Sequence, residues 1–335
     1  MLFKMFFKPK SGAGTGMSPY RRATKLAAIL TLNTFAAVTA QAAPENHPVP
    51  PMVADGARLV MEYGDGRFFE GPAWDPATGR LYFTAFGKVK GEDNQQIMRL
   101  DARGQASVWM DKTGGINGTC LSRDGRLLAA QGMSHNVLSM RIGPDGPQDV
   151  KTLSSGFEGV PYIQPNDIVE SPVTGSIYYT DPEFAGKEHS AVYHLSPSGK
   201  VQRIITHLKI PNGVLVSNDG KTLFVSDSFD KRIYSYSIRD DGGVNQGQVK
   251  IFFDPATSSQ ADPDGMTSDV EGNLYFAMRG GVWVASPRGE SLGLIAVPEF
   301  CSNVCFGGPN GKTLFMTCSG KVYSLAMKVS GSHVE

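Results

Sequence analysis

The chain has 335 residues, a length that suits one large domain or two small ones. Its 32 Lys and Arg residues equal its 32 Asp and Glu residues, so it lacks the basic excess that a nucleic-acid-binding protein needs. The 39 Gly and 21 Pro residues favour a turn-rich, all-β protein, because tight turns need residues with a positive or a fixed φ.

The first 42 residues have the pattern of a secretory signal peptide. A basic segment, Arg21 to Lys25, precedes the apolar run 26–40, which ends in the small-x-small sequence Ala40-Gln41-Ala42. The run is too short for a membrane span of ~20 residues. We therefore expect cleavage near Ala42 and a periplasmic or secreted protein, without stable membrane association once the signal is removed. All six charged residues of this segment are basic, so 32 less 6 leaves 26 basic residues against 32 acidic ones in the mature chain.

An internal repeat follows this leader. Each copy has a polar anchor residue, about eight further residues, a Gly, and then a strand of the type Leu-Tyr-Phe-x-Thr. The anchor residues lie 47, 49, 46, 52 and 39 residues apart and are Glu70, Asn117, Asn166, Asn212, Asp264 and Asn303. A β-sandwich has no repeat of this length, and the coils of a β-helix are shorter. The sequence predicts an all-β, six-bladed β-propeller over 58–329, with a linker over 43–57 and a tail over 330–335.

Each repeat can be divided into the four strands of a blade. The anchor begins or precedes strand A at the central channel, the Gly forms a turn, and Leu-Tyr-Phe is strand B. Segments 192–195 and 232–237 are expected to be C strands. The turns expected to join strand C to strand D are 101–104, 196–199 and 286–289. Asp181 and Asp227, at the ends of B strands, are interpreted as structural turn carboxylates.

The four cysteines are Cys120, Cys301, Cys305 and Cys318, and each lies in an apolar, strand-like segment. No pair has CxxC spacing, which argues against a zinc knuckle. Small buried thiols are the favoured interpretation. An oxidising compartment would also permit a disulfide, and the alternatives are Cys301–Cys318 and Cys305–Cys318.

The anchor residues are expected to ring one mouth of the central channel, because a propeller brings equivalent positions of every blade around one axis. Two carboxylates and several amide oxygens suit one hard divalent ion, above all Ca²⁺, with Zn²⁺, Mg²⁺ or Mn²⁺ as alternatives. Asn-Gly and Asp-Gly pairs are also common in turns, and a turn role is the favoured interpretation for Asn117 and Asn303. For Glu70, Asn212 and Asp264 a functional role is favoured.

Four motifs resemble the gluconolactonase and senescence-marker-protein family in order and spacing, and the resemblance extends over about residues 65–328. They are Glu70-Gly-Pro-Ala-Trp, Pro165-Asn166-Asp167, Pro211-Asn212-Gly213 and Pro263-Asp264-Gly265-Met266. The resemblance is to the bacterial gluconolactonase branch. It implies a catalytic metal bound by Glu70, Asn212 and Asp264, with Asn166 in contact with the metal or the substrate. It also implies hydrolysis of sugar lactones.

Two positions depart from this family. Gln164 stands where the sugar-lactone enzymes of animals carry Arg, and Gln131-Gly132 stands where bacterial relatives often carry Glu-His. Both changes remove groups that could hold a polyhydroxylated substrate, so the identity of the substrate stays open. The residues predicted to contact the substrate are Asn117, Asn166 and Gln164.

Together these patterns predict a metal-dependent hydrolase that opens a small, sugar-type lactone or a related ester. Asp264 would act as the general base and Asn166 would position the ring. A non-catalytic, metal-stabilised propeller that binds a sugar or sugar acid is one alternative, and a phosphotriesterase-like hydrolase is another. The expected partner is a small-molecule lactone, and the sequence leaves the oligomeric state open.

Overall fold

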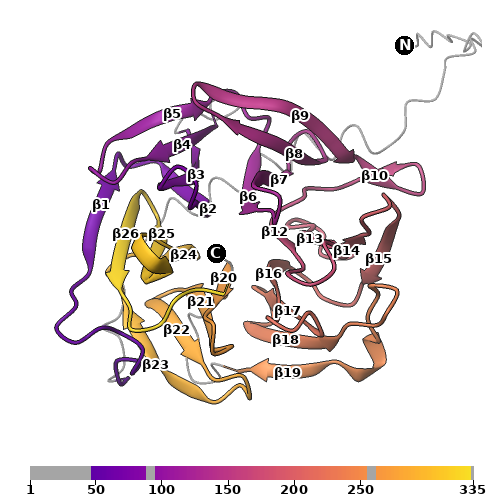
Figure 1. Ribbon diagram of the computed structural model, residues 1–335. Coiled ribbons are helices and arrows are strands. Elements are labelled where there is room, and N and C mark those ends of the chain that lie inside the picture. Colours follow the sequence, from indigo (N-terminus) through magenta and orange to yellow (C-terminus); the bar gives the residue numbers. More distant parts are fainter. Residues whose placement is uncertain (1–46, 88–94, 255–261, 333–335) are drawn as a thin grey trace, which may run out of the picture. The chain divides into compact units, whose positions relative to one another are not determined.

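The computed structural model describes residues 47–87, 95–254 and 262–332, and it confirms the predicted six-bladed propeller (Figure 1). Each blade is a four-stranded antiparallel sheet. From the axis outward, blade 1 is β2 (Phe68–Asp75), β3 (Arg80–Phe86), β4 (Gln96–Leu100) and β5 (Ala106–Met110). Blade 2 is β6 (Ile116–Leu121), β7 (Arg126–Gln131), β8 (Asn136–Gly143) and β9 (Gly146–Ser154). Blade 3 is β12 (Ile168–Glu170), β13 (Ile177–Asp181), β14 (Ala191–Leu195) and β15 (Val201–Ile205).

The second half of the chain repeats this pattern. Blade 4 is β16 (Pro211–Val216), β17 (Thr222–Asp227), β18 (Arg232–Ser237) and β19 (Lys250–Phe253). Blade 5 is β20 (Met266–Ser268), β21 (Leu274–Met278), β22 (Gly281–Ala285) and β23 (Ser291–Ala296). Blade 6 is β24 (Cys301–Gly307), β25 (Thr313–Cys318), β26 (Lys321–Ala326) and β1 (Val60–Gly64). The smaller elements are the hairpin of β10 (Gly156–Phe157) and β11 (Val160–Pro161) and the 3₁₀ turns η1 (Gln246–Gln248) and η2 (Pro309–Gly311).

Blade 6 closes the ring, because it takes strands from both ends of the described chain. β1 pairs antiparallel with β26, with Val60 opposite Ser324. The innermost strands contact one another in the order β2, β6, β12, β16, β20 and β24, and β24 contacts β2 again. The residues after β26 are also bound, since the backbone N–H of Val270 donates to the carbonyl of Ser330 at 3.0 Å. The expected signal peptide lies outside the described residues.

The Leu-Tyr-Phe pattern forms the core between blades. Tyr178 and Tyr179 of β13 are both fully buried, but successive residues of a strand face opposite sides. Tyr178 packs among residues of blade 4 such as Val225, whereas Tyr179 packs against Leu128 of blade 2. Each B strand therefore fills the space toward both neighbouring blades.

The predicted turns and C strands are confirmed. The Gly before each B strand has a positive φ in all six copies, which are Gly79, Gly125, Gly175, Gly220, Gly272 and Gly311. The C strands predicted in 192–195 and 232–237 coincide with β14 and β18. The three predicted turns lie between β4 and β5, β14 and β15, and β22 and β23.

The cysteines correct one expectation. Cys301 and Cys318 face each other across β24 and β25 and form a disulfide, so the favoured interpretation of four buried thiols is wrong for this pair. The register of β24 against β25 selects Cys301 rather than Cys305 as the partner of Cys318, because Cys305 lies opposite Phe315. Cys120 and Cys305 are thiols, and burial raises the pKa of Cys120 to about 12, which keeps it in the unreactive protonated form.

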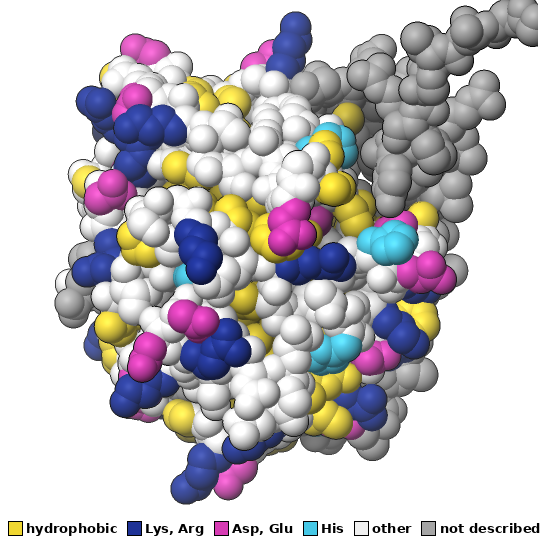
Figure 2. Space-filling model, turned by 90° about the vertical axis from the view of Figure 1, so that its right-hand side faces the viewer, with side chains coloured by type: hydrophobic (Ala, Val, Ile, Leu, Met, Phe, Trp, Pro, Cys, Tyr) yellow, Lys and Arg dark blue, Asp and Glu magenta, His cyan; other side chains and the backbone are white. Residues whose placement is uncertain are grey.

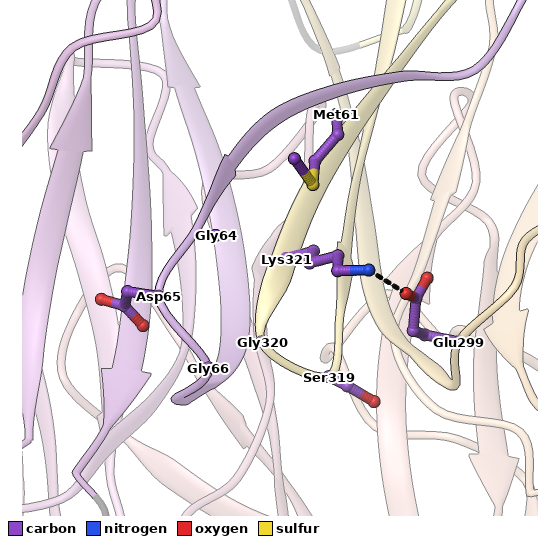
Figure 3. A pocket seen from close by; sticks show the side chains of 8 residues that line it. All are labelled: Met61, Gly64, Asp65, Gly66, Glu299, Ser319, Gly320 and Lys321. Atoms are coloured by element: carbon purple, nitrogen blue, oxygen red, sulfur yellow. Dashed lines mark hydrogen bonds and ion pairs between the residues drawn. The ribbon is translucent and has the colours of Figure 1, made fainter.

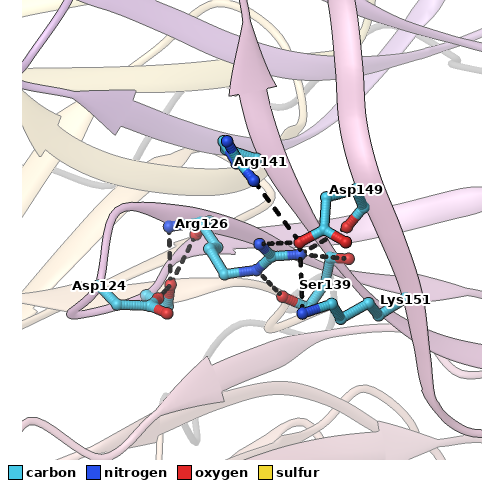
Figure 4. A network of polar contacts seen from close by, with 7 residues as sticks. Asp124, Arg126, Ser139, Arg141, Asp149 and Lys151 are labelled. Carbon is cyan, nitrogen blue, oxygen red and sulfur yellow. Dashed lines mark hydrogen bonds and ion pairs between the residues drawn. The ribbon is translucent and has the colours of Figure 1, made fainter.

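Charged side chains cover the outer surface of the blades. On blade 2, Asp149 of the edge strand β9 pairs with Arg126 at 2.9 Å, Lys151 at 3.3 Å and Arg141 at 3.9 Å (Figure 4). Figure 2 shows Lys and Arg side chains interspersed with Asp and Glu on one side of the molecule. Charged side chains of this kind hinder pairing of an exposed edge with another chain. Within the described residues, no helix is long and apolar enough to cross a membrane.

Candidate active site

Four anchor residues lie inside the innermost strands. Glu70 and Asn117 stand at irregularities in the pairing of β2 with β3 and of β6 with β7. Asn212 and Asn303 stand at the same kind of irregularity in β16 and β24. A bulge inserts a residue that the partner strand does not match, and it turns the side chain in a new direction. The turn interpretation of Asn117 and Asn303 is therefore wrong, because both residues lie within strands, at bulges in the pairing.

The other two anchors directly precede short innermost strands. The backbone N–H of Asn166 donates to the carbonyl of Thr180 at 2.9 Å, ahead of β12. The backbone N–H of Asp264 donates to the carbonyl of Ala277 at 2.9 Å, ahead of β20. Both anchors thus keep a hydrogen bond to the B strand of their own blade, although they lie just outside strand A.

Hydroxyl groups at the ends of B strands hold the anchors of the next blade. Three such bonds join the Oγ1 of Thr84 to the carbonyl of Asn117 at 2.9 Å, the Oγ1 of Thr180 to that of Asn212 at 2.6 Å, and the Oγ of Ser226 to that of Asp264 at 3.0 Å. These bonds explain the Thr that ends the repeated strand pattern. Blades 1, 3 and 4 thus position the anchor residue of the blade that follows.

The asparagine side chains form one hydrogen-bonded chain across the mouth. The Nδ2 of Asn117 donates to the Oδ1 of Asn166, and the Nδ2 of Asn166 donates to the Oδ1 of Asn212. The Nδ2 of Asn212 then donates to the Oγ of Ser228 at 3.1 Å, and this hydroxyl donates to the carbonyl of Pro263 at 2.8 Å. The structure therefore brings together anchors of blades 2, 3 and 4 and joins them to the segment before Asp264.

Two anchor carboxylates are buried beside this amide chain. Glu70 accepts a hydrogen bond from the backbone N–H of Gly71 at 2.9 Å, yet burial, followed by the nearby charge of Asp167, raises its pKa to about 8. Burial, followed by the charges of Glu70 and Asp167, also raises the pKa of Asp264 well above its usual range. The two side chains are close enough to perturb each other, as convergence around the axis predicts.

A third carboxylate, Asp167, was not predicted as part of the site. Burial raises its pKa to about 7, and its Oδ2 accepts the backbone N–H of Val214 at 3.1 Å. The side chain of Asn303 lies near both Asp167 and Glu70 and acts to lower the pKa of each. The sequence carries one signal for this role. Four anchors are followed by Gly, whereas Asn166 is followed by this buried acid.

The donor set fits a hard cation. Within the described residues, Glu70, Asp167 and Asp264 form no ion pair with Lys or Arg, and the Oδ1 of Asn117 is buried without a hydrogen-bond partner. A divalent cation among oxygen donors would offset the repulsion that raises the carboxylate pKa values. In the same part of the chain, no three His, Cys, Asp or Glu side chains are spaced to hold a metal by themselves. A cation here would therefore need the amide oxygens of the asparagines.

The predicted substrate residue Gln164 lies beside this centre, in the segment before Asn166. Its backbone N–H donates to the Oδ1 of Asp181 at 2.5 Å, and a Cβ on Gly132 would lie 2.9 Å from its Cγ. The two departures from the family, Gln164 and Gly132, are thus neighbours. The space that a larger residue 132 would occupy is filled by the Gln164 side chain.

The two carboxylates interpreted as structural are confirmed in that role. Asp181 accepts backbone N–H groups from Ile163 and Gln164, and Asp227 accepts those of Lys209 and Ile210. Each aspartate fixes the loop that leads into an anchor residue. Both carboxylates thus help to shape the site through the backbone of these loops.

A surface pocket lies apart from the anchor residues, between β1 and β26. It has a volume of about 420 Å³ and is lined by residues such as Met61, Asp65 and Lys321 (Figure 3). Lys321 forms an ion pair with Glu299 across it. None of the anchor residues lines this pocket, so it plays no part in the site described above.

A six-bladed propeller with carboxylates and amides at one channel mouth defines a class of small-molecule enzymes and binding proteins. The sequence profile of the SMP-30/Gluconolactonase/LRE-like region matches residues 68–320, so the chain belongs to this family and the resemblance is confirmed. It is 31% identical to gluconolactonase of Zymomonas mobilis over 237 residues, 65% of this chain and 64% of that protein. It therefore spans just under two thirds of that relative.

Two further proteins are similar along more of their length. The chain is 27% identical to a pentonolactonase of Haloferax volcanii over 258 residues, which cover 76% of this chain and 82% of that protein. The solved structure of a gluconolactonase from Xanthomonas campestris has a TM-score of 0.70 and 26% identity, and the match covers 87% of this chain and 99% of that one. These names support the expected lactone-hydrolysing function.

Proposed function

We propose that the protein is a cation-dependent lactonase that opens sugar-type lactones at the mouth formed by Glu70, Asn166, Asn212 and Asp264. The observation that carries the proposal is the burial of Glu70 and Asp264 together, beside a chain of asparagine amides. Two buried carboxylates without a cation must share a proton, whereas a divalent ion stabilises both as anions. The names of the relatives support a lactone as the substrate.

In this proposal, the side chains of the chain have separate tasks. Glu70, Asn212 and Asp264 hold the cation, which we propose to be Ca²⁺, and Asn166 contacts the cation or the lactone ring. When bound, such a cation polarises a carbonyl and stabilises negative charge on its oxygen. Asp264 accepts the proton of the attacking water. Asn117 and Gln164 orient the hydroxyl groups of the sugar.

A chelator experiment tests the proposal. The purified chain should hydrolyse D-glucono-1,5-lactone, lose this activity after exhaustive treatment with EDTA, and regain it when Ca²⁺ is added back. Mg²⁺, Mn²⁺ and Zn²⁺ in parallel identify the preferred ion. Tight binding of the lactone or its acid without turnover would select the non-catalytic alternative. The sequence feature that favours this alternative is the uncharged pair Gln164 and Gly132, which stand where relatives carry Arg and His. Turnover that survives the chelator would contradict the cation dependence.

We also propose that the protein is exported and cleaved near Ala42. The disulfide between Cys301 and Cys318 supports this, because disulfides persist in oxidising compartments. Expression of the full chain in a bacterium should yield a periplasmic protein whose N-terminus, measured by mass spectrometry, begins near Ala43. A soluble protein that keeps its leader would refute the export proposal.

A further inference from the structure

Two lysine ammonium groups lie against one exposed aromatic ring. The Nζ of Lys187 lies 4.0 Å from the centroid of the Phe229 ring, and the Nζ of Lys209 lies 4.5 Å from it. The Phe229 side chain is 42% exposed. In the described part of the chain, neither lysine forms an ion pair with a carboxylate. Two positive charges therefore share one ring without an anionic partner.

The three residues come from three loops at the same end of the propeller as the anchors. Lys187 lies between β13 and β14, Lys209 between β15 and β16, and Phe229 between β17 and β18. Phe229 follows Ser228, and the Oγ of Ser228 accepts a hydrogen bond from the Nδ2 of Asn212 at 3.1 Å. Lys209 stands three residues before Asn212. The cluster thus borders the amide chain on the side of blades 3 and 4.

The loops that carry the lysines are held in place by partly buried hydrogen bonds. The Oγ of Ser190 donates to the carbonyl of Lys209 at 2.7 Å, which joins the two lysine loops to each other. The backbone N–H of Lys209 donates to the Oδ2 of Asp227 at 2.8 Å. The cluster is therefore built on fixed backbone, while the ring restrains the two lysine stems.

Two acidic residues in the same loops, Glu183 and Asp230, already accept hydrogen bonds from other groups. One carboxylate oxygen of Glu183 accepts the backbone N–H groups of Glu188 and His189, each at 3.1 Å. Asp230 accepts the hydroxyl of Tyr234 at 3.2 Å. Two ammonium groups against one ring repel each other, and an anion in contact with them would offset this repulsion. The arrangement is complementary to a ligand that carries a negative charge.

We propose that Lys187 and Lys209 form an anion subsite that selects lactones bearing a negatively charged group away from the lactone carbonyl. The group is a carboxylate, as in the lactone of a sugar diacid, or a phosphate ester. This inference rests on the proposed lactonase function, because it names the substrate class of that site. It assigns the charged end of the substrate to blades 3 and 4 and the reacting carbonyl to Glu70 and Asp264.

The test compares three lactones on the Ca²⁺-loaded full chain. They are D-glucono-1,5-lactone, which is neutral, D-glucaro-1,4-lactone, which has a carboxylate, and 6-phospho-D-glucono-1,5-lactone. The double variant Lys187→Met/Lys209→Met should lower kcat/KM for a charged lactone by about tenfold or more, since two partly solvated attractions are lost. Its kcat/KM for the neutral lactone should change by less than about twofold. Whichever charged lactone shows the larger loss of kcat/KM identifies the group that the subsite prefers, a carboxylate or a phosphate.

Lys200→Met is the matched control, because Lys200 is exposed in the turn between β14 and β15, at the opposite end of blade 3. This variant should leave the ratio of kcat/KM for a charged lactone to kcat/KM for the neutral lactone unchanged. Equal effects of the double variant on all three lactones would overturn the subsite.

If the unaltered protein hydrolyses none of them, the proposed function fails, and calorimetry decides the subsite separately. D-glucarate, with two carboxylates, should then bind more tightly than D-gluconate, and only the double variant should abolish this difference. Equal affinity of the unaltered protein for both acids would overturn the subsite.

Discussion

Replacing Asp264 with Asn should reduce the rate of lactone hydrolysis by a factor of roughly 10² or more, as losses of a general base or of charge stabilisation do. The substitution keeps the shape of the side chain but removes its charge and its ability to accept a proton. Glu70→Gln should also lower activity, because it removes a second of the three buried carboxylates of the site. Steady-state kinetics and elemental analysis of the purified variants measure turnover and bound metal together.

Asp262→Asn is the matched control for this prediction. Asp262 lies two residues from Asp264, but its side chain is 37% exposed and pairs with Arg279 at 2.7 Å. Loss of such an exposed ion pair has a small effect, so activity and metal content should stay within about twofold of the unaltered protein. If Glu70→Gln and Asp264→Asn both kept full metal occupancy and normal rates, the active site would have to lie elsewhere.

Replacing Gly213 with Ala should strongly destabilise the propeller. A Cβ on Gly213 would lie 2.1 Å from the carbonyl oxygen of Asp264 and 2.9 Å from the Cα of Gly265, so it would collide with the backbone of the next blade. Backbone cannot move aside as a flexible side chain can. We expect a loss of about 3 kcal/mol in the free energy of unfolding and a Tm lower by roughly 5–10 °C.

Gly247→Ala serves as its control. At that position a Cβ would meet only the Oδ1 of Asn245, at an ordinary 3.5 Å, and neither glycine has a positive φ. Thermal unfolding followed by circular dichroism should show no drop for Gly247→Ala and a clear drop for Gly213→Ala. A Tm within about 1 °C of the unaltered protein for Gly213→Ala would contradict the close approach of blades 4 and 5 at the axis.

The close approach of neighbouring blades at the axis also explains why Gly follows four of the anchor residues. A Cβ on Gly71 would lie 2.8 Å from the backbone nitrogen of Thr119, and one on Gly118 would lie 2.7 Å from the carbonyl of Asn166. Innermost strands are crowded because they converge on one axis. The sequence pattern suggested a turn at Asn117, since Asn-Gly is common in turns, but crowding between blades is the cause here.

The candidate site residues could be selected from the sequence because the repeat is regular. Glu70, Asn166, Asn212 and Asp264 occupy equivalent positions, so a closed ring brings them together once the blade count is known. Ser228 was not predicted, because its role depends on hydrogen bonds to other blades that leave no local pattern. Asp167 was not predicted either, because its one signal in the sequence is that it replaces the Gly that follows four other anchors. The hydroxyl of Ser228, for example, connects Asn212 with the backbone of Pro263.

By itself, the sequence determined the number of blades, the order of the strands within each and the residues around the channel mouth. It did so because each blade repeats one local pattern of turn glycine and buried strand. Only the tertiary structure decided that β1 completes blade 6, that Cys301 pairs with Cys318 and that Asp167 joins the buried carboxylates. Those features depend on which distant segments become neighbours when the ring closes, and the repeat does not encode that proximity.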